Sequence, residues 1–118
     1  MPRRRSGELT KNELFAFASI KSLLAGGDGE FYSALLDEQM ELDGRPLPIA
    51  SLYRALEHLQ GVGYLTSRLE SEALAAAEGR APRRLYRLTA NGRRASVEIE
   101  VVTEERPRLV LAFRAWGA

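Results

Sequence analysis

Apolar residues recur at helical spacing between Pro48 and Gln60, and the rest of the chain is organised around this stretch. Proline suits the first turn of a helix, because its fixed φ is helical and its missing N–H would have no partner there. Gly61 and Gly63 follow, and glycine ends helices without a steric penalty. The residues of the predicted apolar face are Ile49, Leu52, Tyr53, Leu56 and Leu59.

The opposite face of this helix carries small, hydroxyl and cationic side chains, namely Ala50, Ser51, Arg54 and His58. Such residues let a helix approach the major groove of DNA closely, and Arg54 can bind a guanine edge or a phosphate with both arms of its guanidinium. The same residues are also compatible with the solvated face of an ordinary amphipathic helix. The helix alone leaves both interpretations open.

Two stretches of alternating apolar and polar residues, Leu65–Ser71 and Leu85–Thr89, predict half-exposed strands. The connection between them, Glu72–Pro82, contains a glycine and ends in a proline, so we expect a hairpin. Three arginines lie in or beside its tip: Arg80, Arg83 and Arg84. A helix followed by a hairpin with a basic tip is typical of a winged helix.

Two further helices are predicted upstream. Thr10-Lys-Asn-Glu13 has the form of a capping box, and the helix that it opens should run to about Ala25. This helix is apolar on almost every side, so it must be covered on more than one side. We expect the winged helix to cover one side and the C-terminal segment of a second subunit to cover the other. The second helix, about Glu30–Leu42, has an acidic face that should turn away from phosphates.

Three segments resemble the PadR family of bacterial transcriptional regulators over roughly residues 13–95. They are Ser51-Leu-Tyr-Arg-Ala-Leu-Glu-His-Leu, Gly63-Tyr-Leu and Arg83-Arg-Leu-Tyr-Arg-Leu-Thr-Ala-Asn-Gly-Arg-Arg94. The resemblance implies a homodimer with a C-terminal dimerisation helix, which represses nearby genes and is released by small molecules, often apolar or aromatic ones. Gly29-Glu30-Phe31 departs from the Gly-Tyr that family members commonly show there, so any role of that tyrosine is in doubt.

The segment 90–118 has a pattern that allows two structures. Val97–Val101 alternates like a strand, but the resemblance places the dimerisation helix here and a lone strand would have no partner. We therefore predict a helix that is kinked or broken at Pro107. Its apolar end, Arg108–Trp116, should form a seam between subunits, with packing onto its own subunit as the alternative. Phe113 and Trp116 would line a ligand cleft in that seam, or Trp116 would pack in the dimer core.

Charge is distributed unevenly along the 118 residues, although the net charge is only +1. Residues 48–94 carry eight arginines against four glutamates, whereas residues 27–47 carry six anions and one cation. A basic block that coincides with the predicted helix and hairpin is the electrostatic pattern expected of a DNA-binding face. The basic arm at the N-terminus could reach into a minor groove or simply aid solubility.

The composition argues against several classes of function. The chain has no cysteine and one histidine, so neither a His/Cys metal cluster nor a nucleophile activated by histidine can be assembled convincingly. No phosphate-binding loop appears, and we expect neither enzymatic activity nor a cofactor. The longest apolar run, Leu109–Phe113, is far too short to span a bilayer, and a signal peptide is not expected. These features predict a cytoplasmic protein.

The sequence thus predicts a mainly α protein with a small β-hairpin, in the α+β class. A basic N-terminal arm (1–8) precedes a winged helix-turn-helix domain (9–89) and a C-terminal dimerisation helix (90–118). We expect a homodimeric regulator that binds double-stranded DNA at a pseudo-palindromic operator and responds to a small-molecule effector. The predicted DNA contacts are Ser51, Arg54, His58, Arg80, Arg83 and Arg84. The competing prediction is a winged-helix protein-interaction module that does not bind DNA.

Overall fold

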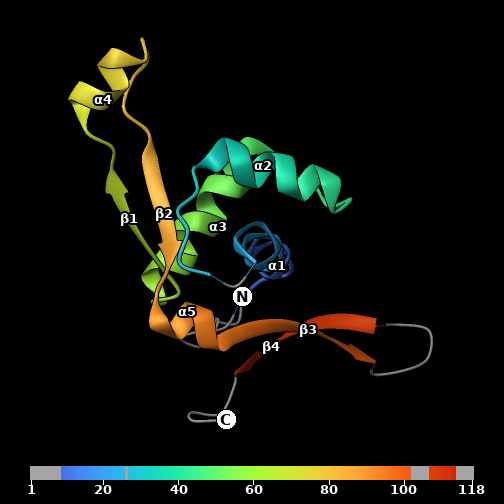
Figure 1. Ribbon diagram of the computed structural model, residues 1–118. Coiled ribbons are helices and arrows are strands. Elements are labelled where there is room, and N and C mark those ends of the chain that lie inside the picture. Colours follow the sequence, from blue (N-terminus) through green and yellow to red (C-terminus); the bar gives the residue numbers. More distant parts are fainter. Residues whose placement is uncertain (1–8, 26, 102–106, 114–118) are drawn as a thin grey trace.

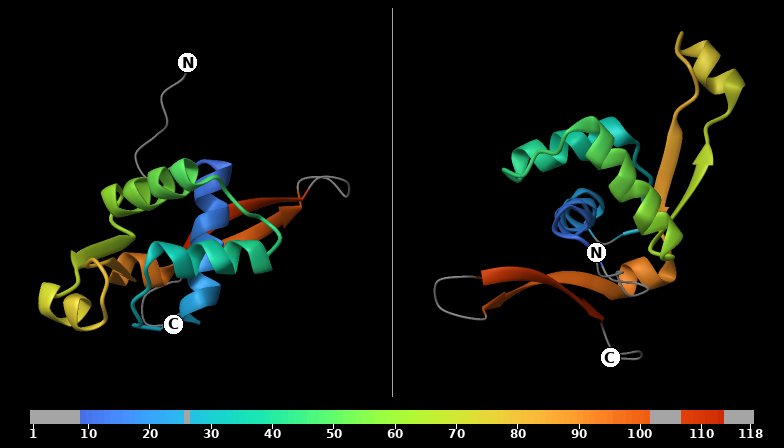
Figure 2. Two further views of the ribbon diagram at one scale, coloured as in Figure 1. Left: turned by 90° about the horizontal axis from the view of Figure 1, so that it is seen from above. Right: turned by 180° about the vertical axis from the view of Figure 1, so that it is seen from behind.

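The computed structural model describes residues 9–25, 27–101 and 107–113. Three helices pack around one apolar core, and two β-hairpins leave this core in different directions (Figures 1 and 2). The helices of the core are α1 (Lys11–Leu24), α2 (Ser33–Leu42) and α3 (Ile49–Gly61). The first hairpin joins β1 (Leu65–Leu69) to β2 (Arg84–Leu88) through the short helix α4 (Glu72–Ala77). After α5 (Ala90–Arg94), β3 (Ala95–Val101) and β4 (Pro107–Phe113) form the second hairpin.

Helix α1 begins and ends close to where the sequence predicts. The amide of Thr10 donates to the Glu13 carboxylate at 2.9 Å, and the Glu13 amide donates to the Thr10 hydroxyl at 3.2 Å. This confirms the capping box, which satisfies two amides that the helix leaves unpaired. Ala25 takes the left-handed conformation after the last residue, with φ of 50°.

Helix α3 confirms the predicted amphipathic helix, but its buried face is rotated. Leu52, Leu56 and Leu59 are buried as expected, and Ala55 joins them in place of two larger residues. Ile49 and Tyr53 are 59% and 50% exposed, so the prediction that both line the core is wrong. Ala55 belongs to the apolar core, together with residues of α1, α2 and the first hairpin.

Helix α2 begins at Ser33 rather than near Glu30, because the preceding residues are extended. Phe31 forms an antiparallel bridge to Tyr86, with backbone N–H···O distances of 2.9 and 2.8 Å. The two rings also stack, with centroids 5.5 Å apart. The segment before α2 thereby extends the sheet beside β2 and fixes α2 against it.

The first hairpin, which we call the wing, confirms the two predicted strands. Its antiparallel register runs from Leu65 opposite Leu88 to Leu69 opposite Arg84. The connection at its tip is more ordered than expected, because Ser71 caps α4 by accepting from the Leu74 amide at 3.4 Å. Gly79 follows with φ of +73°, which glycine adopts without strain. The wing projects away from the helices and carries α4 at its far end (Figure 1).

The predicted C-terminal helix is wrong for the described residues beyond Arg94. Residues 95–101 and 107–113 form an antiparallel pair, from Ala95 opposite Phe113 to Val101 opposite Pro107. The alternating, β-branched stretch at 97–101 is a strand, and β4 is the partner that its pattern alone does not reveal. Pro107 breaks no helix but begins β4, a position where a strand tolerates proline.

This second hairpin covers α1 within the same chain. Both of its strands lie beside α1 and contact it (Figure 1). Val97 and Leu111 pack against the main core. The prediction that a second subunit covers this side of α1 is therefore wrong, and the alternative of packing onto the same subunit holds for Leu111. Lys21 of α1 adds a polar link, since its ammonium group donates to the carbonyls of Gly92 and Arg93 at 3.0 and 2.9 Å.

Candidate nucleic-acid interface

The outward face of α3 is fixed by the helix geometry. Each residue of an α-helix turns by about 100°, so positions opposite the buried Leu52, Leu56 and Leu59 recur every three or four residues. Ala50 and Arg54 occupy these opposite positions in the first two turns, and both are exposed. Proline precedes the helix as its N-cap, and α3 thus presents a small residue and a cation side by side.

The flank of α3 that faces α1 holds the other two predicted contact residues of this helix. His58 is only 20% exposed, and its Nδ1 lies 3.6 Å from a carboxylate oxygen of Glu13 on α1. Ser51 is half-buried, and its hydroxyl accepts from a guanidinium nitrogen of Arg54 at 3.4 Å. The geometry gives His58 a role at the α1–α3 contact and gives Ser51 a role in orienting Arg54.

The opposite flank of α3 meets the wing in a hollow of about 280 Å³. Arg84 of β2 donates to the Ser67 hydroxyl at 3.1 Å, and that hydroxyl donates to the Gln60 side chain at 2.8 Å. This relay ties the exposed Arg84 to the last turn of α3. Tyr53 stands at the same hollow, and its hydroxyl hydrogen-bonds with that of Ser33 on α2 at 3.1 Å. These hydrogen bonds fix the wing relative to α3, so the two elements form one continuous surface.

The remaining wing arginines have different surroundings. The guanidinium carbon of Arg83 lies 4.1 Å from the centroid of the Tyr32 ring, a cation–π contact that holds the group at the start of α2. Arg80 is occupied by acidic neighbours, because it donates two hydrogen bonds to Glu70, at 2.5 and 2.9 Å, and further ones to Glu78. Its side chain is 22% exposed. Arg80 therefore orders the wing tip and is poorly placed to bind an anion from outside.

This ion pair at the wing tip predicts a pH dependence. The hydrogen bonds from Arg80, with help from the Arg83 amide, lower the pKa of Glu70 from 4.5 to about 2. A depressed carboxylate pKa contributes stability that is present above 4.5 and lost as pH falls through about 2. We expect the NMR signals of the α4 amides to change with a midpoint near pH 2 rather than near 4.5, because signals of the folded protein follow the pKa of Glu70 in the folded state. A Glu70→Gln variant should lack this transition, and an unchanged transition in that variant would assign it to another group.

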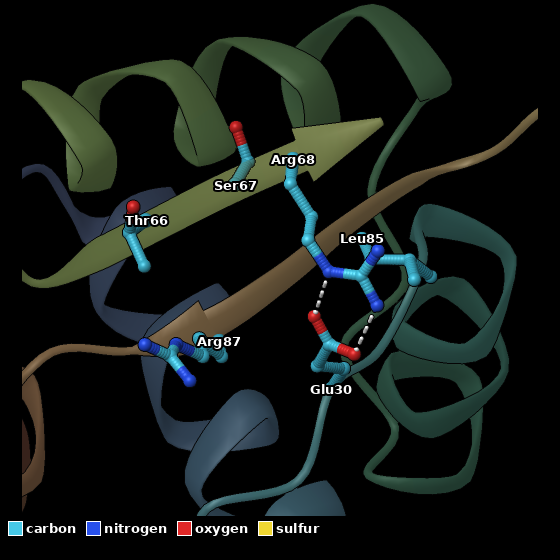
Figure 3. A pocket seen from close by; sticks show the side chains of 6 residues that line it. All are labelled: Glu30, Thr66, Ser67, Arg68, Leu85 and Arg87. Carbon is cyan, nitrogen blue, oxygen red and sulfur yellow. Dashed lines mark hydrogen bonds and ion pairs between the residues drawn. The ribbon is translucent and has the colours of Figure 1, made fainter. Parts of the chain in front are cut away.

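The outer face of the wing carries a second basic cluster, which is not among the predicted DNA contacts. Arg68 binds Glu30 through two hydrogen bonds of 2.8 and 2.9 Å, which lower the pKa of that carboxyl group (Figure 3). Arg87 lies beside the pair, at the edge of a hollow of about 270 Å³ that Thr66 and Leu85 also line (Figure 3). The strict alternation of β1 and β2 would have placed these residues on one face, so the signal was present in the sequence.

Comparison with known structures agrees with this architecture. The circadian clock associated protein Pex from Anabaena is 26% identical, with a TM-score of 0.50, and the match covers 69% of this chain and 66% of that one. The ferric uptake regulator of Vibrio cholerae, a protein with DNA-binding domains, matches 87% of this chain and 68% of its own with a TM-score of 0.52. At 12% identity the latter shares the fold alone. The fold is a winged helix. The chain spans just under two thirds of the Pex chain.

No family model and no curated protein matches the chain, so the PadR resemblance stays a prediction. The six predicted DNA contacts do not lie at one place. Arg84 lines the hollow between α3 and the wing, whereas Ser51 and Arg54 line a second hollow between α3 and the start of α1. His58 contacts Glu13 of α1, Arg83 lies over the Tyr32 ring, and Arg80 is bound by acidic neighbours at the wing tip. Tyr53 and Gln60 line the same hollow as Arg84 but were not predicted there. Trp116 lies outside the described residues, and so do the basic arm and the side chain of Phe113.

Metal-binding and membrane-spanning features are absent from the part of the chain that the structure describes. Within those ranges, no group of three or more histidine, aspartate or glutamate side chains could hold a metal ion. No helix among the same residues is long and apolar enough to cross a membrane.

Proposed function

We propose that this chain is a sequence-specific DNA-binding transcriptional regulator, a repressor that acts as a homodimer. The observation that carries the proposal is the outward face of α3. There Ala50 and Arg54 stand opposite a fully buried apolar face, next to a projecting hairpin with exposed arginines. The small residue lets the helix backbone approach base edges, and the guanidinium matches the two acceptors of guanine. The likeness to a regulator with DNA-binding domains supports the proposal at the level of the fold.

The two parts of the surface have different tasks in this proposal. Arg54 lies at the centre of α3 and reads base edges in the major groove. Arg84, oriented by Ser67 and Gln60, binds the adjacent backbone together with Arg83. Backbone contacts fix register and add affinity, but they carry no sequence information directly. Arg80 is left out of the DNA contacts because its donors are taken by Glu70 and Glu78.

A homodimer would present two such helices to a pseudo-palindromic operator, with half-sites about one helical turn apart. The described residues contain no C-terminal helix to join the subunits. They contain instead a two-stranded hairpin whose strands pair only with each other there. We propose that the subunits meet through this C-terminal region. A small-molecule effector acting near Phe113 and Trp116 stays a prediction.

Selection of bound duplexes from a random pool tests the proposal. We expect enrichment of a two-fold symmetric motif, a dimer mass in sedimentation of the free protein, and affinity that falls steeply as salt rises. Failure to enrich any duplex at low salt would contradict the proposal and favour the protein-interaction module. A motif without two-fold symmetry would contradict the homodimer alone.

If α3 reads bases and the wing binds the DNA backbone, removal of the wing arginines should have a defined effect. Replacing Arg83 and Arg84 together with alanine should weaken binding to all duplexes alike. The slope of log K against log salt should flatten by about one unit for each phosphate that the variant no longer binds. Fluorescence anisotropy at several salt concentrations measures both quantities. Arg93→Ala is the matched control, because it removes a cation that pairs with Asp28 on a different surface. A changed sequence preference with a constant slope would show that the wing reads bases.

A further inference from the structure

Glu57 is the one carboxylate on the outward face of α3 among the described residues. It lies three residues after Arg54, so the two side chains are neighbours on the helix surface. The side chain is exposed and borders the hollow between α3 and the wing. No hydrogen bond or ion pair joins it to another described residue, so its oxygens are free to accept from a ligand.

A carboxylate in this position has consequences for DNA binding. Close to phosphates it repels the duplex, and this repulsion is offset only where a group on the DNA donates hydrogen bonds to it. In the major groove such donors are the amino groups of cytosine and adenine. Adenine presents an acceptor next to its amino group, and a carboxylate has no hydrogen to donate to that acceptor. Cytosine is therefore the base that a carboxylate selects.

We propose that Glu57 is a specificity-determining residue that selects cytosine next to the base pair read by Arg54; this inference rests on the proposed DNA binding. The spacing supports adjacent base pairs. Three residues of an α-helix advance by about 4.5 Å, and one base pair advances by about 3.4 Å along each strand. A helix lying along the groove thus brings Glu57 to the neighbour of the pair that Arg54 contacts. The operator half-site should contain guanine and cytosine at neighbouring positions.

The test is duplex selection with the unmodified protein and with Glu57→Ala and Glu57→Gln. The unmodified protein should enrich cytosine at one position beside the guanine. Glu57→Ala should lose discrimination at that position alone, by on the order of tenfold. Glu57→Gln should shift the preference there towards adenine, because an amide matches both the amino group and the acceptor of adenine. Loss of the cytosine preference in Glu57→Ala is the result that a merely solvated carboxylate cannot give, and the shift in Glu57→Gln shows that position 57 faces the base.

Glu38→Ala is the matched control, since it removes an exposed carboxylate from α2. It should leave the base preference unchanged at every position. An identical motif from Glu57→Ala and the unmodified protein would overturn the role of Glu57 while leaving DNA binding intact. If Glu57→Ala strengthens binding to all sequences equally, the carboxylate acts only by repulsion and the inference also fails. If the unmodified protein enriches no duplex, both this inference and the proposed function fail.

Discussion

Gly92→Ala should destabilise the protein by about 2–3 kcal/mol, because it places a methyl group where the fold has no room. A Cβ atom at this position would lie less than 3.0 Å from the backbone carbonyl oxygen of Tyr64. That carbonyl cannot easily move, since it accepts the Thr89 amide at 3.1 Å. Thr89 is itself fixed, with its hydroxyl donating to the Gly63 carbonyl at 2.5 Å. Chemical denaturation, with the slope of the unfolding transition checked for constancy, measures the loss.

Gly61→Ala is the control for this experiment. Gly61 ends α3, and a Cβ atom there would meet no other atom within 4 Å. Alanine at this position should leave stability unchanged or raise it by up to about 1 kcal/mol, since glycine loses more conformational freedom on folding. Equal stability of the two variants would mean that α5 shifts freely away from Tyr64. The close approach of α5 to the base of the wing would then not be a constraint of the fold.

Arg54→Ala should lower the affinity for the selected operator by about 1–3 kcal/mol and leave folding intact. The side chain is exposed, and its one hydrogen bond among the described residues, to Ser51, is long at 3.4 Å. Its loss therefore costs the folded protein little, whereas the complex loses a charged donor at the centre of α3. Isothermal titration or anisotropy with the operator gives the affinity, and circular dichroism checks the fold.

Arg54→Lys separates base reading from a phosphate contact. Lysine keeps the charge but lacks the fork that binds two acceptors at once. If Arg54 reads guanine, the lysine variant should lose most of the discrimination at that base while binding of unrelated duplexes stays similar. If Arg54 binds only a phosphate, the charge that lysine retains should preserve affinity for all sequences. Full operator affinity in Arg54→Ala would remove Arg54 from the interface.

The sequence predicted the parts of the fold whose signals are local. The capping box at Thr10 marks the start of α1, Gly61 and Gly63 mark the end of α3, and the alternation predicted at 65–71 and 85–89 marks the wing strands. For the candidate site, the sequence placed Arg54 on the exposed face of α3, and its contact with DNA stays a prediction. The local structural predictions succeeded because a helix period and a strand period specify which residues share a face, before any packing is known.

The features of the fold and the site that the sequence did not reveal depend on contacts between residues that are distant in the sequence. The strand pattern at 97–101 was visible, but its partner at 107–113 was interpreted as part of a helix, so the hairpin was missed. Tyr53 was assigned to the core because it is apolar at helical spacing. The tertiary packing buries Ala55 and leaves Tyr53 half exposed, which the spacing alone does not indicate. Likewise, nothing in the spacing of Arg80 indicates that Glu70, ten residues earlier, already binds it.

The cover that β3 and β4 provide for α1 has a consequence for the order in which the protein can fold. During synthesis, α1 leaves the ribosome long before β4. The side of α1 that the hairpin covers therefore stays exposed until the residues of β3 and β4 have been made. Contacts between segments so far apart close slowly, because a long loop must be ordered first. We infer that the helices and wing assemble early and that docking of the hairpin on α1 completes the fold. Until then, the newly made chain exposes an apolar surface, which is the kind of surface that aggregates and that chaperones bind.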